Sequence, residues 1–219
     1  MADLEPANRP AFLGPEAVET LMAAIAHRRS LGVARLLPDP VSARLIQRTL
    51  EAADWAPNHG DTEPWRFTVY TGESRRALGQ AFAEAYRLEA ERDGDYKQNA
   101  WEGQRDRPLG APVWIAIGME PMLRADGTLR MSIEDELMAV ACAVQNLHLV
   151  ASAQGLAGMW LSKGLLVHPH VAEFVGLTSP HARLLGFFIL GWPGIPWPAG
   201  ERRPLSEKVR WIEPPTTDA

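Results

Sequence analysis

Residues 138–154 read MAVACAVQNLHLVASAQ, and this run decides the fold of the chain. A helix built from it would be apolar on nearly every side, apart from Gln145, Asn146 and His148. A helix that is hydrophobic all round is buried all round. A chain of 219 residues needs a surface beyond its own to bury such a helix on every side, and a symmetric partner subunit is the simplest source of that surface. We therefore expect a core helix that a homodimer covers.

Both ends of this helix are marked in the sequence. Ser132, with Asp135 three residues later, forms a capping box that predicts a helix start. Gly155 predicts the stop, directly after Gln154.

Three helices are expected upstream. Pro15 suits a first helical turn, and apolar periodicity extends that helix to about residue 27. A second helix over 42–54 ends where Pro57 disfavours helical backbone in the preceding residue, and a third covers about 74–92. The first two present apolar faces made of Val18, Leu21, Met22 and Ile25, and of Leu45, Ile46, Leu50 and Ala53.

The remaining pattern predicts an α+β fold. Strands are expected at 67–70, 113–119, 184–190 and 209–212, with a strand-like and loop segment at 156–165 and a short helix at 169–176. The apolar run 113–119 is typical of a central strand. Because regular β-α-β alternation is missing, we expect a mixed central sheet flanked by helices, in one domain over 15–219 after a flexible arm over 1–14. The polar stretch 93–110 is interpreted as a lid over a site or a mobile excursion.

Composition excludes several classes of protein. A net charge of −5, from 22 basic and 27 acidic residues, predicts no nucleic-acid partner. Cys142 stands alone, which excludes an intrachain disulfide, and its apolar surroundings predict a buried packing residue. The start of the chain lacks a secretory pattern and no apolar run is long enough for a bilayer, so we expect a cytoplasmic protein without a membrane partner.

Short motifs of common enzymes do not occur. The sequence contains no GxGxxG fingerprint, no P-loop and no nucleophile elbow. The triplet His-Pro-His at 168–170 suggests a metal, but a structural site needs four ligands and no others stand at a fixed spacing. We expect no metal site, and interpret His168 and His170 as flanking a helix start at the surface.

Arg28-Arg29-Ser30 has two interpretations. The first is a pair of charges at a helix C-terminus, where cations are electrostatically favoured. The second is a phosphate clamp, because guanidinium groups match phosphate oxygens and Ser30 can donate one more hydrogen bond. By themselves these residues favour neither interpretation.

The segment 56–67, APNHGDTEPWRF, places a proline-stiffened polar loop between a buried helix and a strand. Binding groups concentrate on loops that rigid elements hold at both ends. Asn58 and His59 could donate to a flat heterocycle while Trp65 anchors the loop. An ordinary connecting loop is an equal alternative.

Six segments together resemble the nitroreductase superfamily, and within it the compact YdjA-like branch. In chain order they are 28–30 (RRS), 56–67 (APxxxxxxPWRF), 145–147 (QNL), 153–162 (AQGLAGMWLS), 185–193 (LGFFILGWP) and 202–205 (RRPL). No segment is specific alone, but the resemblance keeps its order from about residue 17 to 213. The branch is indicated by Pro57-Asn58-His59.

The resemblance implies an intertwined homodimer with two FMN sites at its interface. Arg28, Arg29 and Ser30 would hold the ribityl phosphate and the flavin edge, and Arg202 would complete the phosphate site. The implied flavin-lining residues are Trp160, Leu161 and Ser162, together with Asn58 and His59 from a loop that reaches the flavin of the other subunit.

The resemblance also implies the reaction. It is that of an FMN-dependent oxidoreductase, which uses NAD(P)H by a ping-pong mechanism to reduce nitroaromatic, quinone or similar small-molecule acceptors. Hydride transfer needs no side-chain acid or base, so we expect binding residues and no classical catalytic residue. Nothing in the sequence separates NADH from NADPH. The alternatives are a non-catalytic flavin-binding dimer, a scaffold without cofactor, or another flavin reaction such as reductive dehalogenation.

Two positions depart from the family pattern. Asp61 and Glu63 stand where many members carry asparagine and glutamine. Carboxylates would repel a reduced, negatively charged flavin. Either these side chains point away from it, or the potential and the range of acceptors are altered.

Overall fold

The computed structural model describes residues 13–212, where four strands form one sheet in the order β1-β2-β4-β3. The strands are β1 (Trp65–Thr71), β2 (Val113–Met119), β3 (Ala157–Leu161) and β4 (Arg183–Gly191). Neighbouring strands in this order pair antiparallel, and a parallel bridge joins Ser30 to Gly158 at the edge of β3. The predicted α+β class is confirmed.

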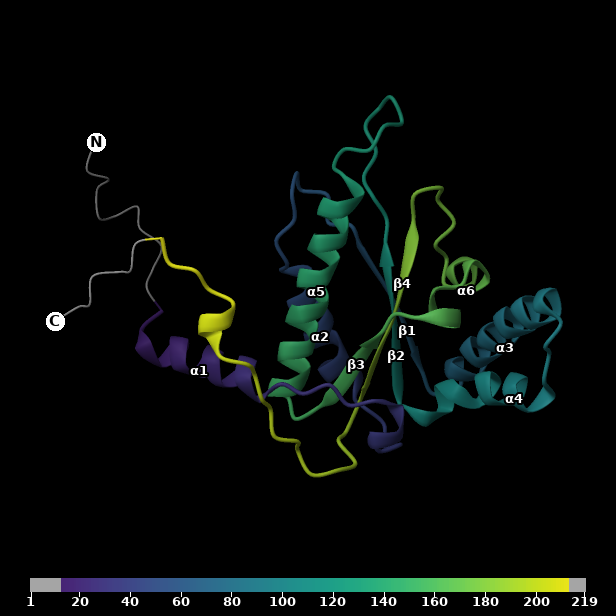
Figure 1. Ribbon diagram of the computed structural model, residues 1–219, viewed down its shortest axis with the longest axis horizontal. Helices are drawn as coiled ribbons and strands as arrows, with labels where there is room; N and C mark the ends of the chain where they lie inside the picture. The colour runs from purple at the N-terminus through teal and green to yellow at the C-terminus, as the bar shows by residue number, and fades with distance from the viewer. Residues whose placement is uncertain (1–12, 213–219) are drawn as a thin grey trace.

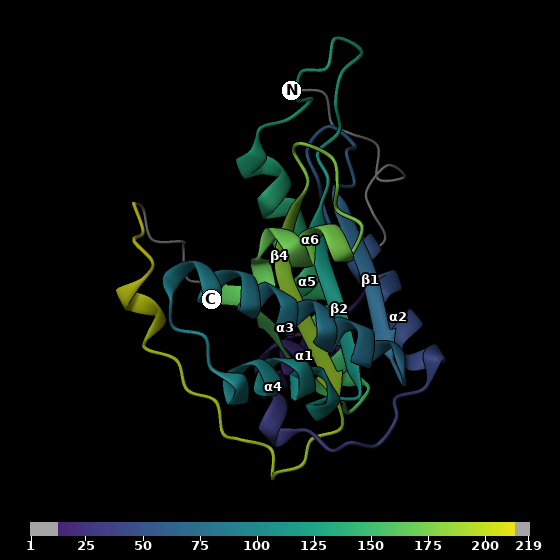
Figure 2. The same cartoon turned by 90° about the vertical axis from the view of Figure 1, so that its right-hand side faces the viewer.

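Helices cover both faces of the sheet (Figure 1). On one face lie α2 (Ala43–Asp54) and α5 (Ile133–Ala153); on the other lie α3 (Ser74–Asp93), α4 (Gln98–Asp106) and α6 (Pro169–Phe174). Figure 2 looks onto this second face, with α3 and α4 in front of the strands.

The central strand β2 divides the core in two. Successive side chains of a strand point to opposite faces. Ile115 and Ile117 therefore pack with α2 and α5, whereas Trp114 and Ala116 pack with α3 and α6. All seven residues of β2 are buried, as its apolar sequence predicts.

Helix α5 begins and ends where the sequence predicts. The Ser132 hydroxyl accepts a hydrogen bond from the backbone N–H of Asp135 at 3.0 Å and donates one to its carboxylate at 2.7 Å. By length and composition α5 could cross a bilayer, yet its inner face packs on α2 and the sheet as in a core helix.

The outer face of α5 is exposed in the single chain. Leu137 and Met138 are 41% and 59% exposed, and Cys142 is exposed beside them. The prediction of a buried Cys142 is therefore wrong for one copy of the chain, because apolar composition does not reveal which face of a helix meets the sheet.

Helix α1 (Pro15–His27) has the predicted bounds but none of its residues is buried. In Figure 1 it leaves the layered body on the side of α5. Its apolar side chains are between 42% and 58% exposed, namely Val18, Leu21, Met22 and Ile25. The face predicted from periodicity is thus present, with no surface of the same chain to cover it in the part that the structure describes.

Two predicted segments differ from the structure, and a third lies largely outside the described residues. The stretch 93–110 is not an irregular excursion, because α4 packs against α3 there and η3 (Arg107–Gly110) leads into β2. The polar composition did not predict this helix, because α4 has no buried residue and its backbone, at Arg105, lies close to Gly79 of α3. Residues 209–212 form no strand: they follow a short turn, η5 (Leu205–Glu207), and pair with no strand in the described part of the chain. Of the predicted arm over 1–14, residues 1–12 lie outside the described residues.

Candidate functional site

The segment Arg28-Arg29-Ser30 runs from the end of α1 onto the edge of β3. The backbone N–H of Arg28 still donates to Ala24 in α1 at 3.3 Å, and Leu31 donates to the carbonyl of Gly158 at 3.1 Å. The predicted clamp therefore lies beside the strand that carries Trp160 and Leu161, although about 130 residues separate them in sequence.

Arg28 is half-buried and has an incomplete set of partners. Its Nη1 lies 3.5 Å from the Ser30 hydroxyl and 3.4 Å from Nδ1 of His148. Its Nε is buried and has no hydrogen-bond partner among residues 13–212. Burial, and then the charges of Arg202 and Arg29, lower the pKa of Arg28 from its usual value. A guanidinium in this position is suited to a further anionic partner.

Arg29 is tied to the backbone. Its Nη1 donates to the carbonyls of Ala26, His27 and Arg28, at 2.6 to 3.1 Å, and its Nε donates to Pro198 at 2.8 Å. These bonds satisfy carbonyls at the end of α1, where a helix leaves its last acceptors without partners. Arg29 thus links the end of α1, through Nη1, to the C-terminal chain at Pro198, through Nε.

Arg202 is brought to the same place by the proline-rich segment that follows β4. Trp197 stacks on His27 with 5.0 Å between ring centroids, and its indole N–H donates to the His27 carbonyl at 2.7 Å. Arg202 is exposed, and its charge acts on Arg28. Arg28, Arg29 and Arg202 are called the cation cluster below. Among residues 13–212 no carboxylate forms an ion pair with any of the three.

A cavity of about 220 Å³ lies at the free edge of β3. It is lined by Trp160, Leu161 and Ser162, the residues for which the resemblance implied contact with a flavin, and also by Arg107, Lys163 and Leu166. The Trp160 indole is fixed because its N–H donates to the carbonyl of Leu185 at 2.9 Å.

Asn58 and His59 lie near the other end of α5. The Asn58 side-chain oxygen accepts from the backbone N–H groups of Thr62 at 2.7 Å and Glu63 at 3.3 Å, so it shapes its own loop. The His59 side chain is 72% exposed, 4.0 Å from Asp135, over a surface hollow of about 390 Å³ that Met138 and Cys142 also line.

A single chain does not bring Asn58 and His59 close to the cation cluster. His59 lies near Asp135 in the first turn of α5, and Arg28 lies near His148 in the last third of the helix. Thirteen residues at 1.5 Å per residue separate these positions by about 20 Å along the helix.

The Nitroreductase family model matches residues 25–192, which include Arg28 and His59 and make up about three quarters of the chain.

The chain belongs to the nitroreductase family.

Individual relatives agree with this membership. YdjA of Escherichia coli and YfhC of Bacillus subtilis are both named provisionally as NAD(P)H nitroreductases. YdjA is 29% identical over 76% of this chain and 85% of its own length. YfhC is 26% identical over 84% of this chain and 90% of its own length. A 5,6-dimethylbenzimidazole synthase from Rhodospirillum rubrum is 27% identical over 80% of this chain and 84% of its own length.

Solved structures share the fold. A nitroreductase-like protein from Bacillus cereus superposes with a TM-score of 0.70 at 28% identity, covering 89% of this chain and 96% of the other. A Desulfovibrio desulfuricans nitroreductase-type structure in complex with FMN gives a TM-score of 0.64 at 23% identity, over 90% and 97% of the two chains. NfnB from Mycobacterium smegmatis, in complex with NADPH, gives 0.66 at 19% identity, over 90% and 100%.

Arg107 is a candidate site residue of this family member that the sequence did not indicate. It is half-buried, and burial lowers its pKa from the usual value. Its side chain donates to the neutral Gln104, at 3.5 Å. In sequence it stands among other arginines of a polar stretch, and only its place in the cavity beside Trp160 and Leu161 of β3 distinguishes it from them.

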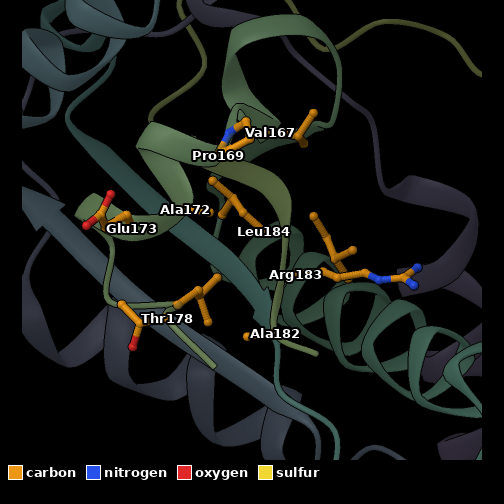
Figure 3. A pocket seen from close by; sticks show the side chains of 10 residues that line it. Val167, Pro169, Ala172, Glu173, Thr178, Ala182, Arg183 and Leu184 are labelled. Atoms are coloured by element: carbon orange, nitrogen blue, oxygen red, sulfur yellow. The ribbon is translucent and has the colours of Figure 1, made fainter. Parts of the chain in front are cut away.

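A larger cavity lies elsewhere, between α6 and the start of β4. It measures about 600 Å³ and is mostly apolar, with Arg183, Glu173 and Thr178 as its polar residues (Figure 3). None of the predicted binding residues lines it. We place the candidate site at the cation cluster and the β3 edge, because there cations without a carboxylate partner in the described chain gather beside an aromatic strand. His168, near this cavity, accepts from the backbone N–H of His170 at 3.1 Å and caps α6. The predicted helix start is confirmed, but His170 lies inside the helix and both side chains are half-buried.

Proposed function

We propose that this nitroreductase is an FMN-dependent oxidoreductase that takes electrons from NAD(P)H and reduces nitroaromatic, quinone or similar small acceptors. The observation that carries the proposal is the cation cluster, in which Arg28 keeps a buried Nε without a partner in the described chain. A phosphate monoester carries a charge of about −1.5 to −2 at neutral pH and three acceptor oxygens, which fits such a site.

The residues present fit FMN in two parts. Arg28, Ser30 and Arg202 would hold the phosphate, and Arg29 would hold the chain segments that carry them. Trp160, Leu161 and Ser162 would line the ring system. When bound, FMN supplies the acceptance and delivery of hydride, so the protein has to provide position and charge.

Arg107 and Lys163 provide that charge at the β3 edge. A half-buried cation favours a bound group that becomes negative, because the surrounding dielectric is lower than that of water. Asp61 and Glu63 are exposed on the loop that carries Asn58 and His59, so neither carboxylate lies at the β3 edge of the same chain. The relatives named as NAD(P)H nitroreductases, and the neighbours with FMN and NADPH, support the choice of cofactor and reductant.

A homodimer completes the site in this proposal. The exposed apolar face of α1 and the exposed outer face of α5 are the surfaces that a second copy would cover. An isolated helix of thirteen residues is marginally stable in water, so α1 needs such a partner. In a two-fold arrangement Asn58 and His59 of one subunit could reach the β3 edge of the other, which the single chain leaves about 20 Å away along α5.

The dimer can be tested on α1. We expect Met22→Glu to weaken self-association at least tenfold, because it places a carboxylate in the apolar face. Ala23→Glu adds the same charge away from that face and is the matched control. Sedimentation equilibrium measures both. A wild-type chain that is monomeric at micromolar concentration, or equal effects of the two substitutions, would refute this interface.

The reaction itself can be tested by its first half. NAD(P)H should reduce the bound flavin when no acceptor is present, since a ping-pong enzyme completes this step alone. A flavin that stays oxidised would instead favour the non-catalytic, flavin-binding alternative.

A further inference from the structure

His148 is a buried polar residue of α5 that lies directly behind the cation cluster. It is 6% exposed, and its ring meets the edge of Phe188 in β4 with 4.9 Å between centroids. Its Nε2 lies 3.1 Å from the carbonyl oxygen of Arg29, and its Nδ1 lies 3.4 Å from Nη1 of Arg28. The ring thus connects α5 to both arginines.

These two partners determine which protonation state fits. A backbone carbonyl can only accept a hydrogen bond, so Nε2 must carry the proton. A guanidinium can only donate, so Nδ1 must be bare. Only the neutral imidazole with its proton on Nε2 satisfies both contacts, and it directs a lone pair at Arg28.

We propose that His148 is a positioning residue for the phosphate of the flavin, which acts by holding the Arg28 guanidinium with a neutral ring. This inference rests on the proposed function. The Arg29 carbonyl holds the ring, and Nδ1 of the ring in turn restrains the Arg28 guanidinium through its Nη1. This leaves Nε of Arg28, which has no partner in the described chain, for an incoming anion. A restrained guanidinium loses less conformational entropy when it binds, and this strengthens binding.

The electrostatics agree with a neutral ring. Burial, and then the charge of Arg28, lower the pKa of His148 to about 4. The groups that face it are the Arg28 guanidinium and the Arg29 carbonyl from the segment after α1 and the uncharged Phe188 from β4, while the charge of Arg202 acts on Arg28. Protonation would place an N–H against the guanidinium and add a fourth positive charge to the three of the cation cluster, so Arg28 would move away.

The test compares FMN with riboflavin, which differs only by the phosphate. The full chain is freed of flavin, and quenching of flavin fluorescence gives the Kd of each ligand near neutral pH. We expect His148→Leu to raise the Kd of FMN about tenfold while that of riboflavin changes less than twofold, because one hydrogen bond to a charged group is lost. His148→Gln, whose amide can both donate and accept, should keep the FMN affinity within about threefold. Val144→Ala, one turn earlier in the same buried face, is the control for a loosened core and should leave the FMN to riboflavin ratio unchanged.

A pH profile of the flavin-free chain tests whether the ring of His148 is neutral in the folded state. In the unfolded chain His148 takes its proton near pH 6.5, whereas the folded chain resists it down to about pH 4. The unfolded state therefore binds more protons in this window, and wild type should lose thermal stability relative to His148→Gln as the pH falls from 6.5 to 4. This comparison does not depend on any ligand.

Three results would overturn the inference. One is an FMN to riboflavin ratio that His148→Leu leaves unchanged; another is a loss in His148→Gln as large as in His148→Leu. The third is parallel pH profiles of wild type and His148→Gln, which remain informative if His148→Leu does not fold. A wild type that binds neither ligand would instead contradict the proposed function as well, so the two failures are distinguishable.

Discussion

Arg28→Ala should raise the Kd of FMN about 100-fold and leave the Kd of riboflavin within about twofold. Hydrogen bonds to charged groups contribute about 1.5 to 3 kcal/mol each, and 1.4 kcal/mol corresponds to a factor of ten. Arg28 is the member of the cation cluster with a buried, unpartnered Nε in the described chain, so its loss removes the contact that the phosphate would gain. Fluorescence quenching of the two flavins by the full chain measures both constants.

Arg203→Ala is the control for this prediction. Arg203 neighbours Arg202, but its side chain is 80% exposed and lies 3.8 Å from Glu207 in an ion pair. We expect it to change the Kd of FMN less than threefold. If Arg203→Ala raised the Kd of FMN as much as Arg28→Ala does, only the overall positive charge would attract FMN, and Arg28 would form no specific phosphate site.

Gly186→Ala should lower the free energy of unfolding by about 3 kcal/mol or more, since two costs add. Gly186 has a φ of 111°, in the region that favours glycine, and a Cβ there would lie 2.0 Å from the carbonyl oxygen of Leu161. The clash would push Leu161 and Ser162 away from β4, so the affinities for FMN and riboflavin should fall together. Urea unfolding measures the first effect and fluorescence quenching the second.

Gly127→Ala separates these two costs. Gly127 has a similar φ of 82°, and an added Cβ would meet no atom of the described chain within 4 Å, so only the backbone cost of about 1 kcal/mol applies. Equal losses of stability in both variants would show that the close approach of β4 to Leu161 is unimportant.

The parts of the fold that the sequence predicts are those with a local signal. The capping box at Ser132, the stop at Gly155 and the continuous apolar run of β2 each act within a few residues, and each is found as expected. The helix α4 depends instead on contact with α3, which begins more than twenty residues earlier, so its polar sequence resembled an excursion. The exposed face of α5 likewise depends on which side meets the sheet.

The candidate site shows the same difference between what a local sequence signal determines and what tertiary contacts determine. Arg28 and Arg29 are adjacent and chemically identical, yet one keeps a free donor in the described chain and the other is tied to carbonyls that include Pro198, 169 residues away. No local pattern can separate two such roles. His148 and Arg107 could not be assigned for the same reason, because their partners are placed by tertiary packing.

The most direct test of the central claim is an absorption spectrum of the purified full chain, supplemented with FMN if needed and recorded before and after anaerobic addition of NADPH or NADH. We predict that the protein shows the visible flavin bands, that they bleach without any acceptor, and that a nitroaromatic or quinone then restores them. A chain that cannot be loaded with FMN, or bound flavin that neither nicotinamide bleaches, would contradict the account.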